Sequence, residues 1–130
     1  MQQALELALE AEAMGEVPVG AIVVHDGAVV GRAHNRREID HDPLAHAELL
    51  AIKQASENLG RWRLSGCTLF VTLEPCAMCA GALVNARLDR LVFGATDLKS
   101  GTPNHQFSTT PGVLLQACAN LLSRFFKGRR

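Results

Sequence analysis

Two cysteines three residues apart, at the start of a predicted helix, constrain this chain more than any other feature. They are Cys76 and Cys79 in segment 72–79, TLEPCAMC. Pro75 suits the first turn of a helix, because its φ is fixed and it has no N–H. Residues i and i+3 lie on one helix face, and the helix N-terminus favours thiolates. Two thiolates on one face are ligands for a soft divalent cation, usually zinc.

A second helix start of the same kind lies upstream, in segment 42–48, DPLAHAE. Asp42 is a good N-cap residue and Pro43 a good first helical residue. The sequence therefore predicts a helix from Pro43 to about Leu59, with His46 in its first turn. The imidazole of His46 can then reach past the helix end and join the two cysteines as a third ligand.

Three protein ligands leave a fourth position for water, which is typical of catalytic zinc. Zinc lowers the pKa of bound water from about 15.7 towards about 7, and a neighbouring carboxylate can take the proton. Glu48 is the carboxylate in position. H-x-E followed by P-C-x-x-C is the pattern of zinc nucleobase deaminases. The hypothesis is that zinc-bound hydroxide attacks an amino-bearing ring carbon, while Glu48 carries protons to the ring nitrogen and to the departing ammonia.

A structural zinc site is the main alternative, since C-x-x-C with a distant His also occurs in closed four-ligand sites. None of the remaining candidates has metal-ligand spacing to the cluster. The two cysteines are expected to be core thiols, and the histidines to lie in turns or surface loops. These residues are Cys67, Cys118, His25, His34, His41 and His105.

The order of predicted elements indicates an α/β fold. Strands and helices alternate after an opening hairpin, which predicts a mixed central sheet with helices on both faces. The chain length of 130 residues and the hydrophobic content of 48% predict a single domain over residues 1–130. The expected elements are helices at 2–14, 43–59, 75–86 and 114–126, strands at 17–24, 28–32, 67–73 and 88–94, and an irregular segment at 95–112.

Composition limits the possible functions only a little. The formal net charge is +0, so the chain as a whole gives no electrostatic argument for nucleic-acid binding. No apolar run approaches the roughly 20 residues of a membrane span. The cysteines favour metal binding and a reduced, cytoplasmic location over disulfides. The apolar stripe of the last predicted helix, 114–126, is expected to pack in the core. The basic residues at its end are either solvated or contact a phosphate; they are Arg124, Lys127, Arg129 and Arg130.

The chain resembles the TadA-type tRNA adenosine deaminase family, within the cytidine-deaminase-like fold, over nearly its whole length. The zinc motif alone fits any deaminase of that superfamily. The segments GEVPVG and FGA favour the TadA-type family over other deaminases of the superfamily, although guanine and cytosine deaminases share parts of these segments. The marks are segments 15–21 (GEVPVGA), 35–36 (NR), 42–48 (DPLAHAE), 72–82 (TLEPCAMCAGA) and 92–95 (VFGA), Asp97 with Lys99, and Phe125 with Phe126.

The resemblance implies a three-layer α/β/α fold and conversion of adenosine to inosine at the wobble position of a tRNA anticodon stem-loop. It also implies a homodimer with one zinc per subunit, held by His46, Cys76 and Cys79, with Glu48 as proton shuttle. The implied substrate contacts are a hydrogen bond from Asn35 to the flipped base, the backbone of Ala47 at the base edge, Val19 packed on the base, and Asp97 at a ribose.

One departure from the family pattern bears on the substrate. In the family a longer segment precedes the Asn-His that here is Asn104-His105, whereas residues 100–103 run almost straight into it. Two alternatives to a tRNA adenosine deaminase stay open. One is a deaminase of a free nucleobase or nucleoside (guanine, cytosine or cytidine), which would not need a folded stem-loop. The other is a protein-interaction or RNA-binding domain whose fold is stabilised by zinc, in which Glu48 would have no catalytic effect.

Overall fold

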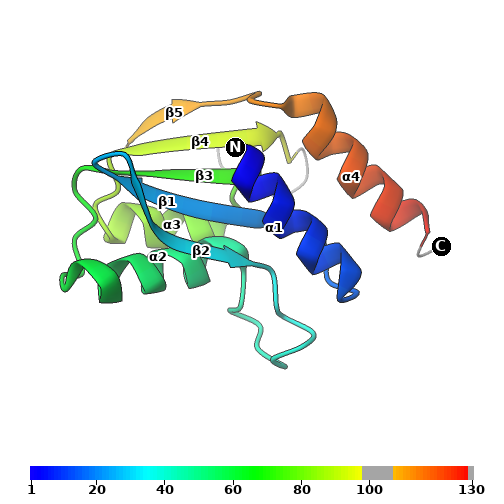
Figure 1. The fold of residues 1–130 in the computed structure, drawn as a ribbon, viewed down its shortest axis with the longest axis horizontal. Helices are drawn as coiled ribbons and strands as arrows, with labels where there is room; N and C mark the ends of the chain where they lie inside the picture. Colours follow the sequence, from blue (N-terminus) through cyan, green and yellow to red (C-terminus); the bar gives the residue numbers. More distant parts are fainter. Residues whose placement is uncertain (98–106, 129–130) are drawn as a thin grey trace.

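The computed structural model describes residues 1–97 and 107–128, and its strands form one mixed sheet in the order β2-β1-β3-β4-β5 (Figure 1). Strand β1 is antiparallel to β2 and β3, whereas β3, β4 and β5 are parallel to one another. The predicted mixed sheet is confirmed. The strands are β1 Gly20–His25, β2 Ala28–His34, β3 Cys67–Leu73, β4 Arg90–Ala95 and β5 Ser108–Thr110.

Helices cover both faces of this sheet (Figure 1). Helices α2 and α3 pack side by side on one face, and α1 and α4 lie on the other. The layering agrees with the predicted α/β/α arrangement. None of the helices in the described part of the chain is long and apolar enough to cross a membrane. The helices are α1 Gln2–Ala13, α2 Ala47–Leu59, α3 Ala77–Asn85 and α4 Leu115–Lys127.

The main core lies between the sheet and the helices α2 and α3. Small residues on α2 allow its backbone to approach the sheet closely, and a Cβ on Gly31 of β2 would collide with the carbonyl oxygen of Ala51. Apolar side chains from the strands fill the remaining space. Fully buried members of this core are Ala21, Val23, Ala47, Ala51, Ala55, Leu64, Cys67, Leu69, Val71, Leu83 and Leu91.

The opening hairpin forms at the predicted turn. Asp26 and Gly27 both have positive φ, 50° and 78°, as the two central residues of a tight hairpin turn require. This turn pairs β1 with β2, and the other edge of β1 pairs with β3. The predicted hairpin is therefore confirmed, and β1 lies inside the sheet.

Two predicted helix starts were wrong, that of α2 by four residues and that of α3 by two. The oxygen Oδ1 of Asp42 accepts a hydrogen bond from the N–H of Leu44 at 2.9 Å, which closes a local turn instead of capping a helix. His46 is extended, with φ −76° and ψ 147°, so α2 begins at Ala47. Cys76 is also extended, with φ −70° and ψ 174°, so α3 begins at Ala77 rather than at Pro75.

Three other expectations need correction. The segment 95–112, expected to be irregular, contains the short strand β5, which is paired with β4. His34, expected on the surface, is buried at the end of β2, where its Nδ1 lies 2.9 Å from the carbonyl oxygen of Asn35. Only part of the stripe on α4 is core: Cys118 and Leu121 are buried, whereas Phe126 is 50% exposed.

Gly20→Ala is expected to destabilise the protein by about 1–3 kcal/mol or more, as overpacking of a rigid contact does. A Cβ on Gly20 would overlap backbone atoms of Ala4 and Ala8 in α1, which cannot move away as a side chain can. Denaturant unfolding of the metal-loaded protein would measure the change. Gly81→Ala, in α3, is the control. A Cβ there meets nothing within 4 Å, so that variant should be neutral or slightly stabilising.

Candidate active site

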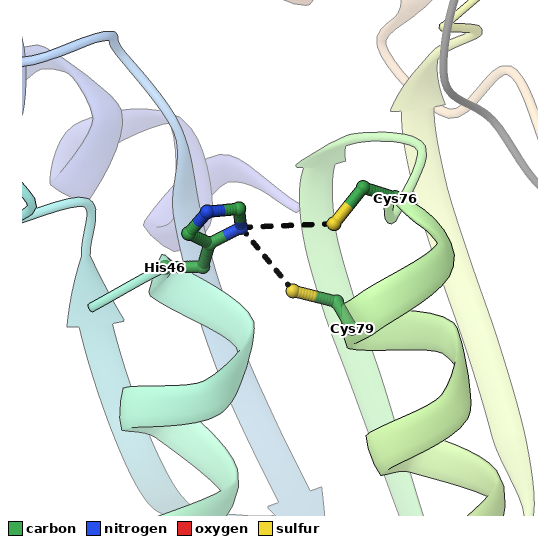
Figure 2. Close-up of side chains that lie close together, drawn as sticks. All are labelled: His46, Cys76 and Cys79. Carbon is green, nitrogen blue, oxygen red and sulfur yellow. Dashed lines mark hydrogen bonds between the residues drawn. The ribbon is translucent and has the colours of Figure 1, made fainter. Parts of the chain in front are cut away.

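The ends of α2 and α3 bring together an imidazole and two thiols (Figure 2). The Nδ1 atom of His46 lies 3.8 Å from Sγ of Cys76 and 3.4 Å from Sγ of Cys79. One ligand atom from each residue lies within 4.8 Å of the other two. The three residues that the sequence singled out as metal ligands are thus assembled in one place.

The local backbone explains why these side chains converge. His46 and Cys76 are the N-cap residues of α2 and α3, and their extended backbone lets the side chains project beyond the helix ends. Cys79 lies in the first turn of α3, on the side facing α2 (Figure 2). Because the cluster lies at the N-termini of α2 and α3, both helices point the positive ends of their dipoles at it.

The donor set fits a metal ion. Burial and the positive charge of Arg37 lower the pKa of His46, which favours the neutral imidazole that binds metals. Burial, together with the neighbouring Glu48 and Cys76, raises the pKa of the Cys79 thiol. A divalent cation between the three donors would reverse this effect, because a coordinated thiol loses its proton. Two thiols and one imidazole are the ligands of a soft or borderline divalent ion.

Glu48 lies in the first turn of α2, close to the cluster, and is only 5% exposed. Burial raises the pKa of its carboxyl group to about 7, whereas hydrogen bonds with its own backbone and with Cys79 act in the opposite direction. A carboxyl group whose pKa lies near the working pH can both accept and donate a proton. Glu48 therefore has the properties of a general acid and base.

A pocket of about 240 Å³ opens over this cluster. Its walls include His46, Cys76 and Glu48. The structure also brings to this pocket all four residues that the resemblance singled out for substrate contacts, although they come from four separate parts of the chain. They are Val19, Asn35, Ala47 and Asp97.

The amide of Asn35 is held in place by the backbone around it. Its Nδ2 donates to the carbonyl oxygen of Val17 at 3.3 Å, and its Oδ1 accepts from the N–H of Arg37 at 3.3 Å. The backbone N–H of Asn35 donates to the carbonyl oxygen of Val19 at 3.0 Å. These bonds occupy one N–H and one lone pair of the side-chain amide, so one of each is left for a ligand.

Sequence reasoning missed several residues of the pocket wall. Glu74 belongs to the cysteine segment and accepts a hydrogen bond at Oε1 from the N–H of Asp97, at 3.0 Å. Phe126 reaches the pocket from α4, although the stripe of that helix indicated only core packing. The missed residues are Val17, Arg37, Leu73, Glu74 and Phe126. Lys99 and the segment 100–105 lie outside the described residues.

Comparison with known proteins gives consistent matches along the whole chain. The profile of the MafB19-like deaminases matches residues 1–130. The chain is 46% identical over 142 residues to the tRNA-specific adenosine deaminase of Bacillus subtilis, covering all of this chain and 88% of that protein. The alignment is longer than the 130 residues of this chain, so the relative has residues with no counterpart here. The short segment at 100–105 would produce a difference of this kind.

Solved structures give the same result for the fold. A structure from work on A-to-I editing by tRNA:A34 deaminases at the wobble position of transfer RNA has a TM-score of 0.89 and 41% identity, covering 94% of this chain and 97% of the other. A guanine deaminase from Nitrosomonas europaea has a TM-score of 0.86 and 26% identity, covering 95% of this chain and 81% of the other.

Proposed function

The chain belongs to the family of the tRNA-specific adenosine deaminases, and on this basis we propose that it hydrolyses adenosine to inosine, with release of ammonia, at the wobble position of a tRNA anticodon. The family resemblance inferred from the sequence is thus confirmed. One observation carries the proposed chemistry: a buried carboxyl group lines the same pocket as two members of the metal-binding trio, His46 and Cys76. Residues 1–130 would form a single deaminase domain.

The metal of this site would be zinc, held by His46, Cys76 and Cys79. The support is the donor set, since two cysteines and a histidine with an open fourth position are typical of catalytic zinc. When bound, zinc supplies Lewis acidity that makes water a nucleophile at neutral pH. The remaining steps fall to the side chains of the pocket.

Glu48 would move the protons of the reaction. It would accept a proton from the attacking water and deliver it to a ring nitrogen of the base. It would next take the remaining proton from the hydroxyl group added to the ring carbon and give it to the departing amino group, so that one water is consumed and one ammonia released. Its burial supports this role, because a carboxyl group with a pKa of about 7 exchanges protons readily at neutral pH.

Four residues of the pocket would hold the flipped adenine. Asn35 would use the free N–H and lone pair of its amide to bind the base, and the backbone of Ala47 would contact the base edge. Val19 would pack on the ring, and Asp97 would contact a ribose. A base taken out of its stack is commonly recognised by such hydrogen bonds and apolar contacts.

An anticodon stem-loop carrying adenosine at the wobble position is expected to be converted to the inosine form by the zinc-loaded protein. Free adenosine, cytidine and guanine should react far more slowly, because they lack the flanking nucleotides. Chromatography of the nucleosides after digestion would measure each product. Turnover of free guanine or cytidine, with an unreacted stem-loop, would contradict the RNA assignment and favour the free-base activity of the guanine deaminase neighbour.

The protein would act as a cytoplasmic homodimer. The location is supported by four free cysteines, Cys67, Cys76, Cys79 and Cys118, which suit a reducing compartment. The dimer is supported by the family resemblance. Sedimentation equilibrium of the zinc-loaded protein tests the dimer.

A further inference from the structure

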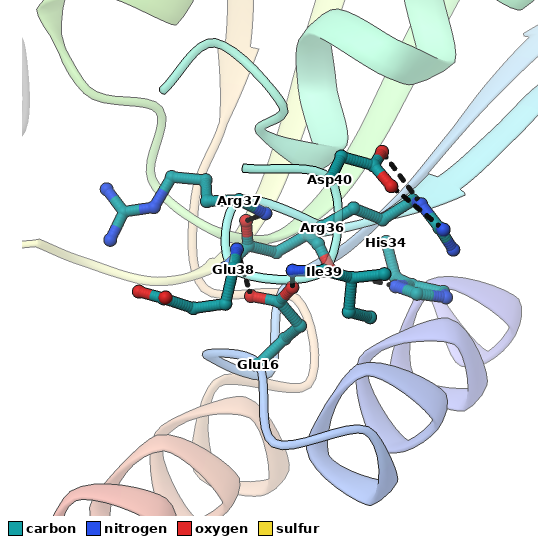
Figure 3. Close-up of polar contacts among 8 residues, drawn as sticks. Glu16, His34, Arg36, Arg37, Glu38, Ile39 and Asp40 are labelled. Atoms are coloured by element: carbon teal, nitrogen blue, oxygen red, sulfur yellow. Dashed lines mark hydrogen bonds and ion pairs between the residues drawn. The ribbon is translucent and has the colours of Figure 1, made fainter. Parts of the chain in front are cut away.

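A buried carboxylate outside the pocket links the end of α1 to a distant loop (Figure 3). Glu16 is only 1% exposed and does not line the pocket over the metal cluster. Its backbone is fixed by the end of α1, where Gly15 has a φ of 81° and the N–H of Glu16 donates to the carbonyl oxygen of Ala11 at 3.0 Å. Glu16 therefore projects from a rigid position.

Both carboxylate oxygens of Glu16 accept hydrogen bonds from the backbone of the loop 36–42. Its Oε1 accepts from the N–H of Glu38 at 3.2 Å, and its Oε2 accepts from the N–H of Ile39 at 2.8 Å. Burying a carboxylate is costly unless it is hydrogen-bonded. Because these bonds go to backbone groups, they fix the path of the loop whatever its side chains are.

The loop is also closed on itself. Arg36 donates to both carboxylate oxygens of Asp40, from Nε and from Nη2, each at 3.0 Å (Figure 3). The N–H of Asp40 donates to the carbonyl oxygen of Arg36 at 2.9 Å, and that of Asp42 to the carbonyl oxygen of Arg37 at 3.1 Å. Glu16 thus holds a compact turn rather than a single residue.

This turn positions two groups at the pocket, the guanidinium of Arg37 and the amide of Asn35. Arg37 is exposed and lines the pocket, and its guanidinium has no ion-pair partner among residues 1–97 and 107–128, whereas the neighbouring Arg36 is paired with Asp40. The backbone N–H of Arg37 also holds the amide of Asn35. Moving the turn would displace both an unpaired cation and an amide at the pocket wall.

We propose that Glu16 is a positioning residue for RNA: it fixes the loop 36–42 so that Arg37 meets a phosphate beside the target adenosine and Asn35 faces the base. This inference rests on the proposed function. Phosphate contacts set the register of a nucleic acid on a protein, and a cation on a fixed loop loses little freedom on binding. Replacement of Glu16 would therefore weaken the binding of RNA and leave the chemical step at the metal cluster unchanged.

Glu16→Gln, in the zinc-loaded protein, tests this inference. The side chain keeps its size, but only one of its two polar atoms can accept, so one backbone bond is lost. We expect KM for the anticodon stem-loop to rise about tenfold and kcat to change less than about twofold, as loss of a positioning contact predicts. The control is Glu38→Gln, the same charge change on an exposed side chain of the same loop. Its KM should match that of the wild type.

Two further readouts separate positioning from general stability. Hydrogen exchange should become faster at the N–H groups of Glu38 and Ile39 but stay unchanged in β1 and β3. Adding Arg37→Ala to Glu16→Gln should raise KM by less than about twofold more, since the two changes act through one contact. Fully additive effects, or equal KM values for Glu16→Gln and Glu38→Gln, would overturn the inference.

A second variant covers the case in which Glu16→Gln does not fold. Ile39→Pro removes one of the two N–H donors from an exposed position, and Ile39→Ala is its control. Only Ile39→Pro should raise KM for the stem-loop, and equal KM values would overturn the inference. A wild-type protein that leaves the stem-loop unreacted would contradict the proposed function itself, which distinguishes that failure from a failure of the Glu16 role.

Discussion

Glu48→Ala is expected to lower kcat for the anticodon stem-loop by about 10³-fold or more while the protein keeps its metal. General acid–base groups contribute about 10²–10⁴-fold each, and Glu48 would serve in both proton transfers. Its carboxyl group is buried beside the cluster but is not one of the three converging ligand residues. Steady-state kinetics would give kcat, and elemental mass spectrometry would give the metal content per chain.

Glu74→Ala is the control for this experiment. Glu74 also lines the pocket, but its carboxylate is engaged with the backbone N–H of Asp97. Its loss should affect kcat by less than about tenfold, as a positioning contact does. If Glu48→Ala instead loses the metal, Glu48 is a ligand and its assignment as proton shuttle is wrong. Unchanged turnover with the metal present would favour a binding module without catalysis.

Cys79→Ala is expected to abolish both metal binding and turnover. Cys79 is fully buried within the cluster, so its replacement leaves only two of the three converging ligand residues. A ligand whose free concentration is about 1,000 times its Kd stabilises the folded state by about 4 kcal/mol. The variant loses this stabilisation, so it should also melt at a lower temperature. Thermal melting with and without a chelator would measure this. The wild type should lose stability on chelation, and the variant should not respond.

Cys118→Ala provides the matched control for the cysteine. Cys118 is equally buried, but it lies on α4, in a second hydrophobic cluster that also contains Leu5 and Ala95. Its replacement should lower the melting temperature through lost packing and leave the metal content and kcat unchanged. One metal per chain and normal turnover in Cys79→Ala would contradict the predicted ligand set.

Local spacing explains why the metal trio was predictable from the sequence. Cys76 and Cys79 are three residues apart, and any helix in this segment brings them to one face. His46 lies at the N-terminal end of its helix whether that helix begins at Pro43 or at Ala47. The predicted starts at Pro43 and Pro75 were nevertheless wrong, because a local turn at Asp42 and extended backbones at His46 and Cys76 delay the helices.

Contacts between distant segments explain what the sequence did not predict. Strand β5 exists because it pairs with β4, and three residues alone carry no periodic signal. Phe126 on the α4 stripe has the same pattern as a core residue, and only the placement of α4 brings it to the pocket. The role of Glu16 depends on two N–H groups 22 and 23 residues away.

The sequence by itself determined the α/β class, the candidate ligand trio, the acid–base candidate and the family, because these depend on local motifs and on the order of the elements along the chain. Only the tertiary structure decided how those segments meet. It placed α2 and α3 side by side, so that His46 faces the two cysteines. It also fixed the loop 36–42 through a buried carboxylate. Burial and long-range hydrogen bonds arise only when the chain is packed, and local patterns in the sequence do not reveal them.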